Sequence, residues 1–258
     1  MKLLRLSKLL LVCCLCLFLV PTSAFASVEN RTEKLDISLL KQGIPFEVIE
    51  SWSPELKKSL LKEDGSIEVV AHEKAPTPDL NGEVEPFGNI KDDQFDYYIT
   101  VVRTDSVNNR ERFMIALTGK WKSMPVWRLS DAYGASFDKD IWRTVEGSAY
   151  YEDKVKYSGN STFTTLGSGR NFSYTGESGV GFNADLKGGI IIKEQVAAAV
   201  FTIEHKEQGN QSGLSQIQSN YYHIKGSGSV GLTFGALSVS FSGSANNDSR
   251  GTLKNFYY

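Results

Sequence analysis

A stretch near the carboxyl end constrains the fold most strongly, because its apolar and small polar residues alternate with a period of two. The stretch is residues 226–244, GSGSVGLTFGALSVSFSGS. This alternation predicts two β-strands with one apolar face each. We expect a hairpin with a two-residue turn at Gly235 and Ala236, so that the apolar side chains of both strands share one face. Those side chains are Val230, Leu232, Phe234, Leu237, Val239 and Phe241.

This hairpin leaves two interpretations open. No charged residue lies between Lys225 and Asp248, so contact with a protein core or with lipid costs little electrostatically. Each arm approaches the about 9 to 11 residues of a membrane-crossing β-strand. In this local respect the stretch resembles the insertion hairpins of aerolysin-like pore-forming toxins, which implies membrane insertion. A sandwich strand with one face in water has the same alternation, and we favour a position in the core.

The amino terminus has the features of an export signal. Three basic residues precede an apolar run, residues 9–20, and a small-x-small cleavage site ends at Ala26. As a helix the run would span about 18 Å, well short of a hydrocarbon core of about 30 Å, so a retained anchor is disfavoured. We therefore expect a signal peptide that is cleaved near Ala26 and a secreted, extracellular protein.

Cleavage would also remove every cysteine. Cys13, Cys14 and Cys16 lie within the signal, so the mature chain would have no disulfide and no thiolate for catalysis or metal binding. It would keep 25 Lys and Arg against 30 Asp and Glu, a net charge of −5. This acidic balance argues against nucleic acid as a partner and against an anionic membrane surface.

Residues 34–64 have the spacing of short helices. Ser53 is suited to cap one of them, and Leu56, Leu60 and Leu61 form an apolar stripe on it. The stripe predicts docking onto a β-rich body. A cleaved pro-segment and a partner-binding helix are the alternatives.

The remaining composition divides the chain into four segments. They are a signal peptide (1–26), a small helical N-terminal region (27–74), a linker with several Pro and Gly residues (75–93) and an antiparallel β domain (94–258).

From residue 94 onward the pattern is almost continuously β. Short runs rich in Tyr, Val, Ile and Phe are separated by Gly, Ser and Asn, as at Asn108 and Asn109. This predicts a mainly β fold, an antiparallel β-sandwich or barrel-like body with a small helical N-terminal region. Residues 190–205 contain enough alanine for a helix, but we favour a long central strand because the flanking segments are all β.

The motifs of common enzymes are weak or absent. Residues 226–231 match G-x-G-x-x-G, but a dinucleotide site needs a helix next, and a strand pattern follows instead. His72, His205 and His223 lack the spacing of paired metal ligands. We therefore predict no catalytic residue, no cofactor and no metal, and a protein that is not an enzyme.

Aromatic residues say more about a possible ligand than these enzyme motifs do. Four pairs of tyrosines are adjacent, and neighbouring strand residues point to opposite faces, so each pair within a strand should bury one ring and expose the other. The pairs are Tyr97-Tyr98, Tyr150-Tyr151, Tyr221-Tyr222 and Tyr257-Tyr258. Exposed rings suit carbohydrate or cell-wall recognition. The candidate aromatic binding surface comprises Trp121, Trp127, Trp142 and Tyr222.

These observations predict a secreted, non-enzymatic binding or structural module of unknown ligand. The first alternative is a protein that inserts its β-hairpin into a membrane. The second is a cell-wall or carbohydrate-binding protein, and a carbohydrate-active enzyme follows it. The partners compatible with the sequence are a cell wall, a carbohydrate or a membrane surface.

Overall fold

The computed structural model describes residues 33–76 and 89–258. Residues Leu39–Tyr258 form one compact unit, whereas the chain up to Ser38 belongs to a separate one. The expected signal peptide lies outside the described residues, as does most of the expected linker. Within the described ranges, no helix is both long and apolar enough to cross a membrane.

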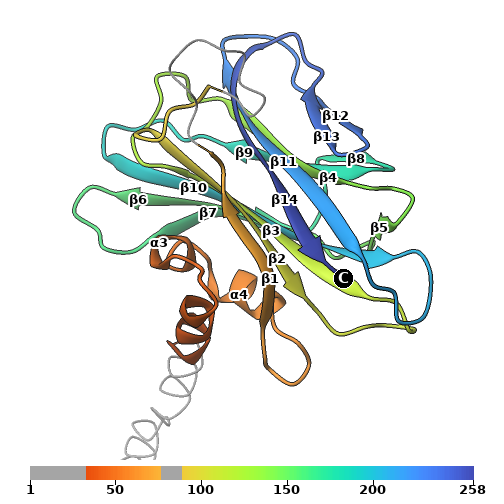
Figure 1. Ribbon diagram of the computed structural model, residues 1–258. Coiled ribbons are helices and arrows are strands. Elements are labelled where there is room, and N and C mark those ends of the chain that lie inside the picture. The colour runs from red at the N-terminus through yellow and green to blue at the C-terminus, as the bar shows by residue number, and fades with distance from the viewer. Residues whose placement is uncertain (1–32, 77–88) are drawn as a thin grey trace, which may run out of the picture. The chain divides into compact units, whose positions relative to one another are not determined.

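Most of the compact unit is antiparallel β-sheet (Figure 1). The larger sheet has seven strands in the order β1-β2-β3-β10-β6-β7, and β5 pairs with β10 outside this path. Its strands are β1 (Glu68–Lys74), β2 (Phe95–Arg103), β3 (Arg112–Trp121), β5 (Trp142–Thr144), β6 (Tyr150–Tyr157), β7 (Thr164–Gly169) and β10 (Ile192–His205).

The second sheet has five strands in the order β14-β11-β4-β9-β8. Its strands are β4 (Ser130–Phe137), β8 (Tyr174–Gly176), β9 (Gly179–Asp185), β11 (Leu214–Lys225) and β14 (Asn246–Tyr257). A separate two-stranded hairpin consists of β12 (Leu232–Gly235) and β13 (Ser238–Phe241). The helices are one over residues 33–41, α3 (Phe46–Ile49) and α4 (Pro54–Ser59).

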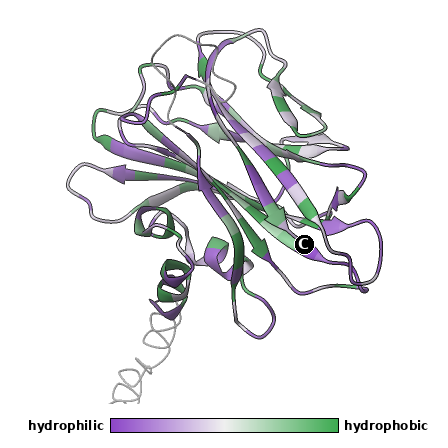
Figure 2. Ribbon diagram, viewed as in Figure 1, coloured by the Kyte–Doolittle hydropathy of each residue, from purple (hydrophilic) through white to green (hydrophobic). Residues whose placement is uncertain are grey.

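The two large sheets enclose a common apolar core, which confirms the predicted mainly β fold. Phe95 of β2 lies 4.5 Å from Tyr221 of β11, between ring centroids, and Phe113 of β3 lies 5.1 Å from Phe256 of β14. Each pair joins one sheet to the other. Figure 2 shows the alternation behind this packing along β11, where apolar and polar residues follow one another.

Helices α3 and α4, which we call the helical head, cover the outer face of the seven-stranded sheet. Leu56 and Leu60 are completely buried, and α4 contacts β10. Trp52 Nε1 donates a hydrogen bond of 2.8 Å to Thr118 Oγ1 on β3. The predicted docking stripe is therefore confirmed for Leu56 and Leu60, whereas Leu61 is half-buried.

Three polar contacts fix the start of α4 and the residues just before it. Ser53 Oγ accepts a hydrogen bond from Leu56 N (3.1 Å), which is the predicted cap, and Ser53 N donates to Glu152 Oε1 on β6 (2.9 Å). Lys154 Nζ, also on β6, donates to Ser51 O (2.8 Å). Ser53 thus both caps α4 and attaches the helical head to β6.

The expectation that each tyrosine pair buries one ring and exposes the other holds at the end of β14, where Tyr257 is 72% exposed and Tyr258 packs against the core, but it is wrong for two other pairs. Tyr97 and Tyr98 are both buried, and so are Tyr221 and Tyr222. The reason is that both outer faces are covered, one by the helical head and the other by the β12–β13 hairpin. A residue that points away from the central core therefore still meets protein.

The strand expected within residues 190–205 is confirmed as β10, which pairs with β3 on one side and with β5 and β6 on the other. Asn108 and Asn109 form the expected turn between β2 and β3, with φ angles of 53° and 61°. Two strands were not foreseen, β4 and β14, because small and polar residues dominate both.

The chain around the expected linker is tied to the sheets. β1 lies before the linker and pairs with β2 after it, so the boundary drawn between 27–74 and 94–258 falls between paired strands. Arg250 of β14 is completely buried. Its guanidinium donates to Ile90 O (2.7 Å) and Ala75 O (2.9 Å), and it contacts Asp92.

The docking of the helical head generates the first prediction. Leu60→Asp should lower the free energy of unfolding by about 3 kcal/mol or more, because it places a charge in a fully buried apolar contact. Leu40→Asp is the control, since Leu40 is exposed, and it should cost less than about 0.5 kcal/mol. Urea unfolding measures both. If Leu60→Asp lowers the free energy of unfolding as little as Leu40→Asp does, the head is not docked on the sheet through Leu60.

Candidate functional site

The hairpin forms a third layer outside the five-stranded sheet (Figure 1). Leu232 pairs with Phe241 and Phe234 with Val239. The turn consists of Ala236 and Leu237, one residue later than expected, and Leu237 has a φ of 53°. This register removes Leu237 from the apolar face. That face is made by Val230, Leu232, Phe234, Val239 and Phe241, which pack against Tyr222, Ile224 and Ala245.

Glycines beneath the hairpin explain how it can lie flat on the sheet. A Cβ atom added to Gly176 would stand 3.2 Å from Phe234 Cδ2, and one added to Gly179 would stand 2.5 Å from Phe234 Cδ1. One added to Gly181 would stand 2.6 Å from Leu232 Cδ1. We call this set the glycine floor: Gly134, Gly176, Gly179 and Gly181.

Hydrogen bonds also fasten the hairpin. Tyr222 Oη donates to Val239 O (2.6 Å), and Asn220 Nδ2 donates to the same oxygen (2.7 Å). At the base, Ser229 N donates to Ser244 Oγ (3.0 Å) and Ser244 N to Ser229 Oγ (3.1 Å). Val239 is buried and the rest of the apolar face is partly buried. The hairpin is thus neither in the central core nor free in water.

A buried carboxylate lies where the pairing of β4 and β11 ends. Asp131 accepts hydrogen bonds from Tyr221 Oη (2.7 Å) and Ile224 N (2.9 Å), and both of its oxygens lie 3.1 Å from His223 Nδ1. Burial raises the pKa of Asp131, and the hydrogen bonds from His223 and the other donors oppose this shift. Trp121 Nε1 donates to Tyr221 Oη (3.1 Å). The group holds the two strands together with satisfied polar atoms.

The other histidines also serve the fold. His72 Nδ1 lies 2.8 Å from Thr100 Oγ1 and its ring stacks on Tyr98, and burial lowers the pKa of His72 to about 4. The His205 ring packs edge-on against Trp142 at 5.2 Å. Across the described ranges, no group of three or more His, Cys, Asp and Glu side chains is arranged to hold a metal ion.

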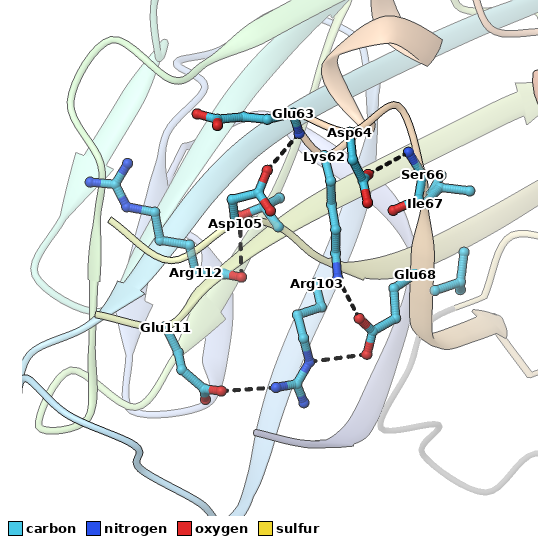
Figure 3. Close-up of polar contacts among 12 residues, drawn as sticks. Lys62, Glu63, Asp64, Ser66, Ile67, Glu68, Arg103, Asp105, Glu111 and Arg112 are labelled. Atoms are coloured by element: carbon cyan, nitrogen blue, oxygen red, sulfur yellow. Dashed lines mark hydrogen bonds and ion pairs between the residues drawn. The ribbon is translucent and has the colours of Figure 1, made fainter. Parts of the chain in front are cut away.

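A polar hollow of about 310 Å³ lies between the end of the helical head and β3. Figure 3 shows polar contacts at and beside this hollow. Glu63 N donates to Asp105 Oδ2 (2.6 Å), and Arg112 Nη2 lies 2.6 Å from Glu204 Oε2. Beside the hollow, Lys62 Nζ lies 2.6 Å from Glu68 Oε2. The Glu63–Asp105 contact joins the segment after α4 to the loop after β2, and the Arg112–Glu204 pair joins β3 to β10.

The four aromatic residues expected to form a binding surface are not brought together. Trp121, Trp142 and Tyr222 are buried. Trp142 Nε1 donates to Ser215 Oγ (2.8 Å), a contact between the two sheets. Trp127 differs, since 50% of it is exposed. The expected aromatic surface is therefore not formed, because three of its members stabilise the interior.

Trp127 instead belongs to a set of exposed apolar residues on two loops, which we call the end-loop patch. One loop connects β3 to β4 and the other connects β9 to β10. Val126 is 93% exposed, and Ile190 is fully exposed. The members are Val126, Trp127, Leu129, Ile190 and Ile191.

Hydrogen bonds hold the two loops side by side. Arg128 Nη1 donates to Gly189 O (3.0 Å), and Leu186 N donates to Leu129 O (3.1 Å). Ser158 N donates to Ile191 O (2.7 Å). The apolar tips are therefore exposed on anchored backbone.

Arg128 places a positive charge within the patch. Its Nε donates to Pro125 O (3.2 Å) and its Nη1 to Gly189 O, so both described partners are backbone carbonyls. Among the described residues no carboxylate forms an ion pair with it. The sequence reasoning missed this patch apart from Trp127. The available signal was a set of apolar residues next to Pro125 and Gly189, in segments that connect strands.

Comparisons with known proteins give weak likenesses. No protein-family model matches the chain, and no curated protein matches it. A solved pore-forming protein shares 9% sequence identity at a TM-score of 0.34, over 74% of this chain and 96% of its own.

The C-terminal domain of the Streptococcus agalactiae AgI/II polypeptide BspA shares 8% identity at a TM-score of 0.29, over 65% of this chain and 60% of its own. The chain thus spans less than two thirds of that domain. Likenesses at this level assign neither a family nor a function.

Proposed function

We propose that this protein is a secreted, non-enzymatic binding module that contacts its partner through the end-loop patch. The observation that carries the proposal is the exposure of five apolar side chains on two adjacent loops. Contiguous exposed apolar patches mark interaction sites in soluble proteins, whereas single exposed apolar residues need no explanation. Here the Arg128–Gly189 contact joins the loop that carries Val126 and Trp127 to the loop that carries Ile190.

The way the loops are held supports binding rather than chance exposure. A fully exposed Ile190 adds no packing to the fold, yet the backbone around it is fixed by hydrogen bonds at Gly189 and Ile191. A surface that is ordered before binding loses less conformational entropy when the partner arrives. Loops on a rigid scaffold are also where binding residues concentrate.

The histidines and two carboxylates make contacts that stabilise the fold, which supports a non-enzymatic role. His72, His205 and His223 each contact an aromatic ring in the interior, and Asp131 is held by three donors. Glu204 lies between Arg112 and Arg143, at 2.6 Å and 2.5 Å. Groups used in this way stabilise the sheets.

The test is a pair of substitutions at the patch. The double variant Val126→Asp with Ile190→Asp should fold normally and lose binding by at least about tenfold, since each change puts a charge into the contact. Leu214→Asp is the control, because Leu214 is exposed at the opposite end of the sheet. Binding is measured by co-sedimentation with phospholipid vesicles and with insoluble cell-wall polysaccharide, and self-association by analytical ultracentrifugation.

Two results would contradict this assignment. One is that the unaltered protein binds none of these surfaces and does not self-associate. The other is that the double variant binds as well as the unaltered protein, which would place the contact elsewhere.

Membrane insertion of the hairpin is the second candidate function. It is favoured by one observation: the hairpin leaves and rejoins the five-stranded sheet between paired neighbours, Lys225 of β11 and Asn246 of β14. Residues 226–245 could therefore extend that strand pair without altering its register. The glycine floor opposes this, since it fits the hairpin in its folded-back position.

Phe234 separates the two candidates. As a partly buried residue on the glycine floor, Phe234→Ala should cost about 2 kcal/mol of stability, less than the about 3 to 5 kcal/mol of a fully buried phenylalanine. The protein should leave dye-filled liposomes intact. Thermal unfolding and dye release measure these outcomes. Dye release that is lost in Val239→Lys, with the fold retained, would instead establish the hairpin as the inserting element.

A further inference from the structure

We infer that the partner of the end-loop patch is the interface of a zwitterionic phospholipid bilayer, such as one of phosphatidylcholine. This inference rests on the proposed function and specifies its partner. Three features of the patch carry it: the chemical types of its residues, the way they protrude, and the charge beside them.

The residue types match the layers of a bilayer surface. Val126, Ile190 and Ile191 are aliphatic and suit the outer hydrocarbon, and Trp127 is the residue type enriched where hydrocarbon meets headgroups. Arg128 lies between the two loops with free donor capacity for a phosphate, because guanidinium is suited to phosphate oxygens. A carbohydrate partner would favour flat aromatic rings over branched aliphatic side chains.

The shape of the patch also fits lipid better than a protein partner. Val126 is 93% exposed and Ile190 fully exposed, so both stand out from their loops rather than line a hollow. A bilayer interface can close around separate protruding residues, whereas a protein partner needs a pocket for each.

The charges indicate that apolar contact dominates the docking. Lys187 forms an ion pair with Asp185, and Lys193 Nζ lies 3.8 Å from Glu194 Oε1, so the lysines near the patch are partly compensated. The whole chain has a net charge of −2, and −5 without residues 1–26, which disfavours an anionic membrane. Binding to a zwitterionic bilayer should therefore change little with salt concentration.

The experiment uses phosphatidylcholine vesicles and the fluorescence of Trp127. The other tryptophans, Trp52, Trp121 and Trp142, are buried, so changes in acrylamide quenching report on Trp127. The protein should float with the vesicles, its emission should shift to shorter wavelength, and quenching should fall. Raising the salt from 50 mM to 500 mM, roughly a threefold shorter Debye length, should change binding by less than about twofold.

Variants assign the contact to individual residues. Val126→Asp with Ile190→Asp should weaken vesicle binding at least tenfold, and Arg128→Gln several-fold, whereas Leu214→Asp should bind like the unaltered protein. Circular dichroism checks that each variant folds. Retained binding in the double variant would overturn the inference.

Other surfaces distinguish failure of this inference from failure of the proposed function. Patch-dependent binding to cell-wall polysaccharide without vesicle binding would overturn the lipid partner and leave the binding module intact. Patch-dependent self-association without vesicle binding would do the same. Binding to anionic vesicles alone, abolished by salt, would also overturn the inference. Absence of binding to every surface would overturn both proposals.

Discussion

Buried side chains point outward from both sheets of this sandwich, and the rest of the structure depends on that constraint. A sheet in a two-layer protein can leave its outer face to water, but here Ala198 and Val200 of β10 point outward and are buried. On the other sheet Tyr222 points outward and is buried. Each outer face therefore needs a cover. The helical head and the hairpin provide one each, at opposite sides of the same core.

The helical head and the hairpin limit where a binding surface can lie. Sheet faces that are closed by the head and by the hairpin offer no open surface at those positions, and the residues there serve packing. The glycines beneath Phe234 make room for the hairpin, since a Cβ atom added to Gly179 would stand 2.5 Å from Phe234 Cδ1. The end-loop patch lies outside the area that the head and the hairpin cover, in loops at one end of the sandwich, and it carries the proposed contact.

The sequence predicted the elements with a clear period and missed those whose residues are small or polar. β3 and β10 were predicted because apolar residues recur along them, and the hairpin because of its alternation. β4 was missed because Ala132, Gly134 and Ser136 are small where the hairpin lies on them. The candidate site was mostly unpredictable, since the Asp131–His223 contact joins residues 92 positions apart and the patch joins two loops. Burial of Trp121 and Trp142 follows from the packing of the two sheets against each other, which no local pattern encodes.

The central claim is that Trp52, Trp121 and Trp142 lie in the interior, with Trp127 as the exposed tryptophan. Acrylamide quenching of the Trp127→Phe variant tests it most directly, because Trp52 reports on the helical head and Trp121 and Trp142 on the core between the sheets. The account predicts that the variant keeps the thermal midpoint of the unaltered protein and that its remaining fluorescence is almost unquenched. Strong quenching in the folded variant would show that a face described here as closed is open, and would contradict the account.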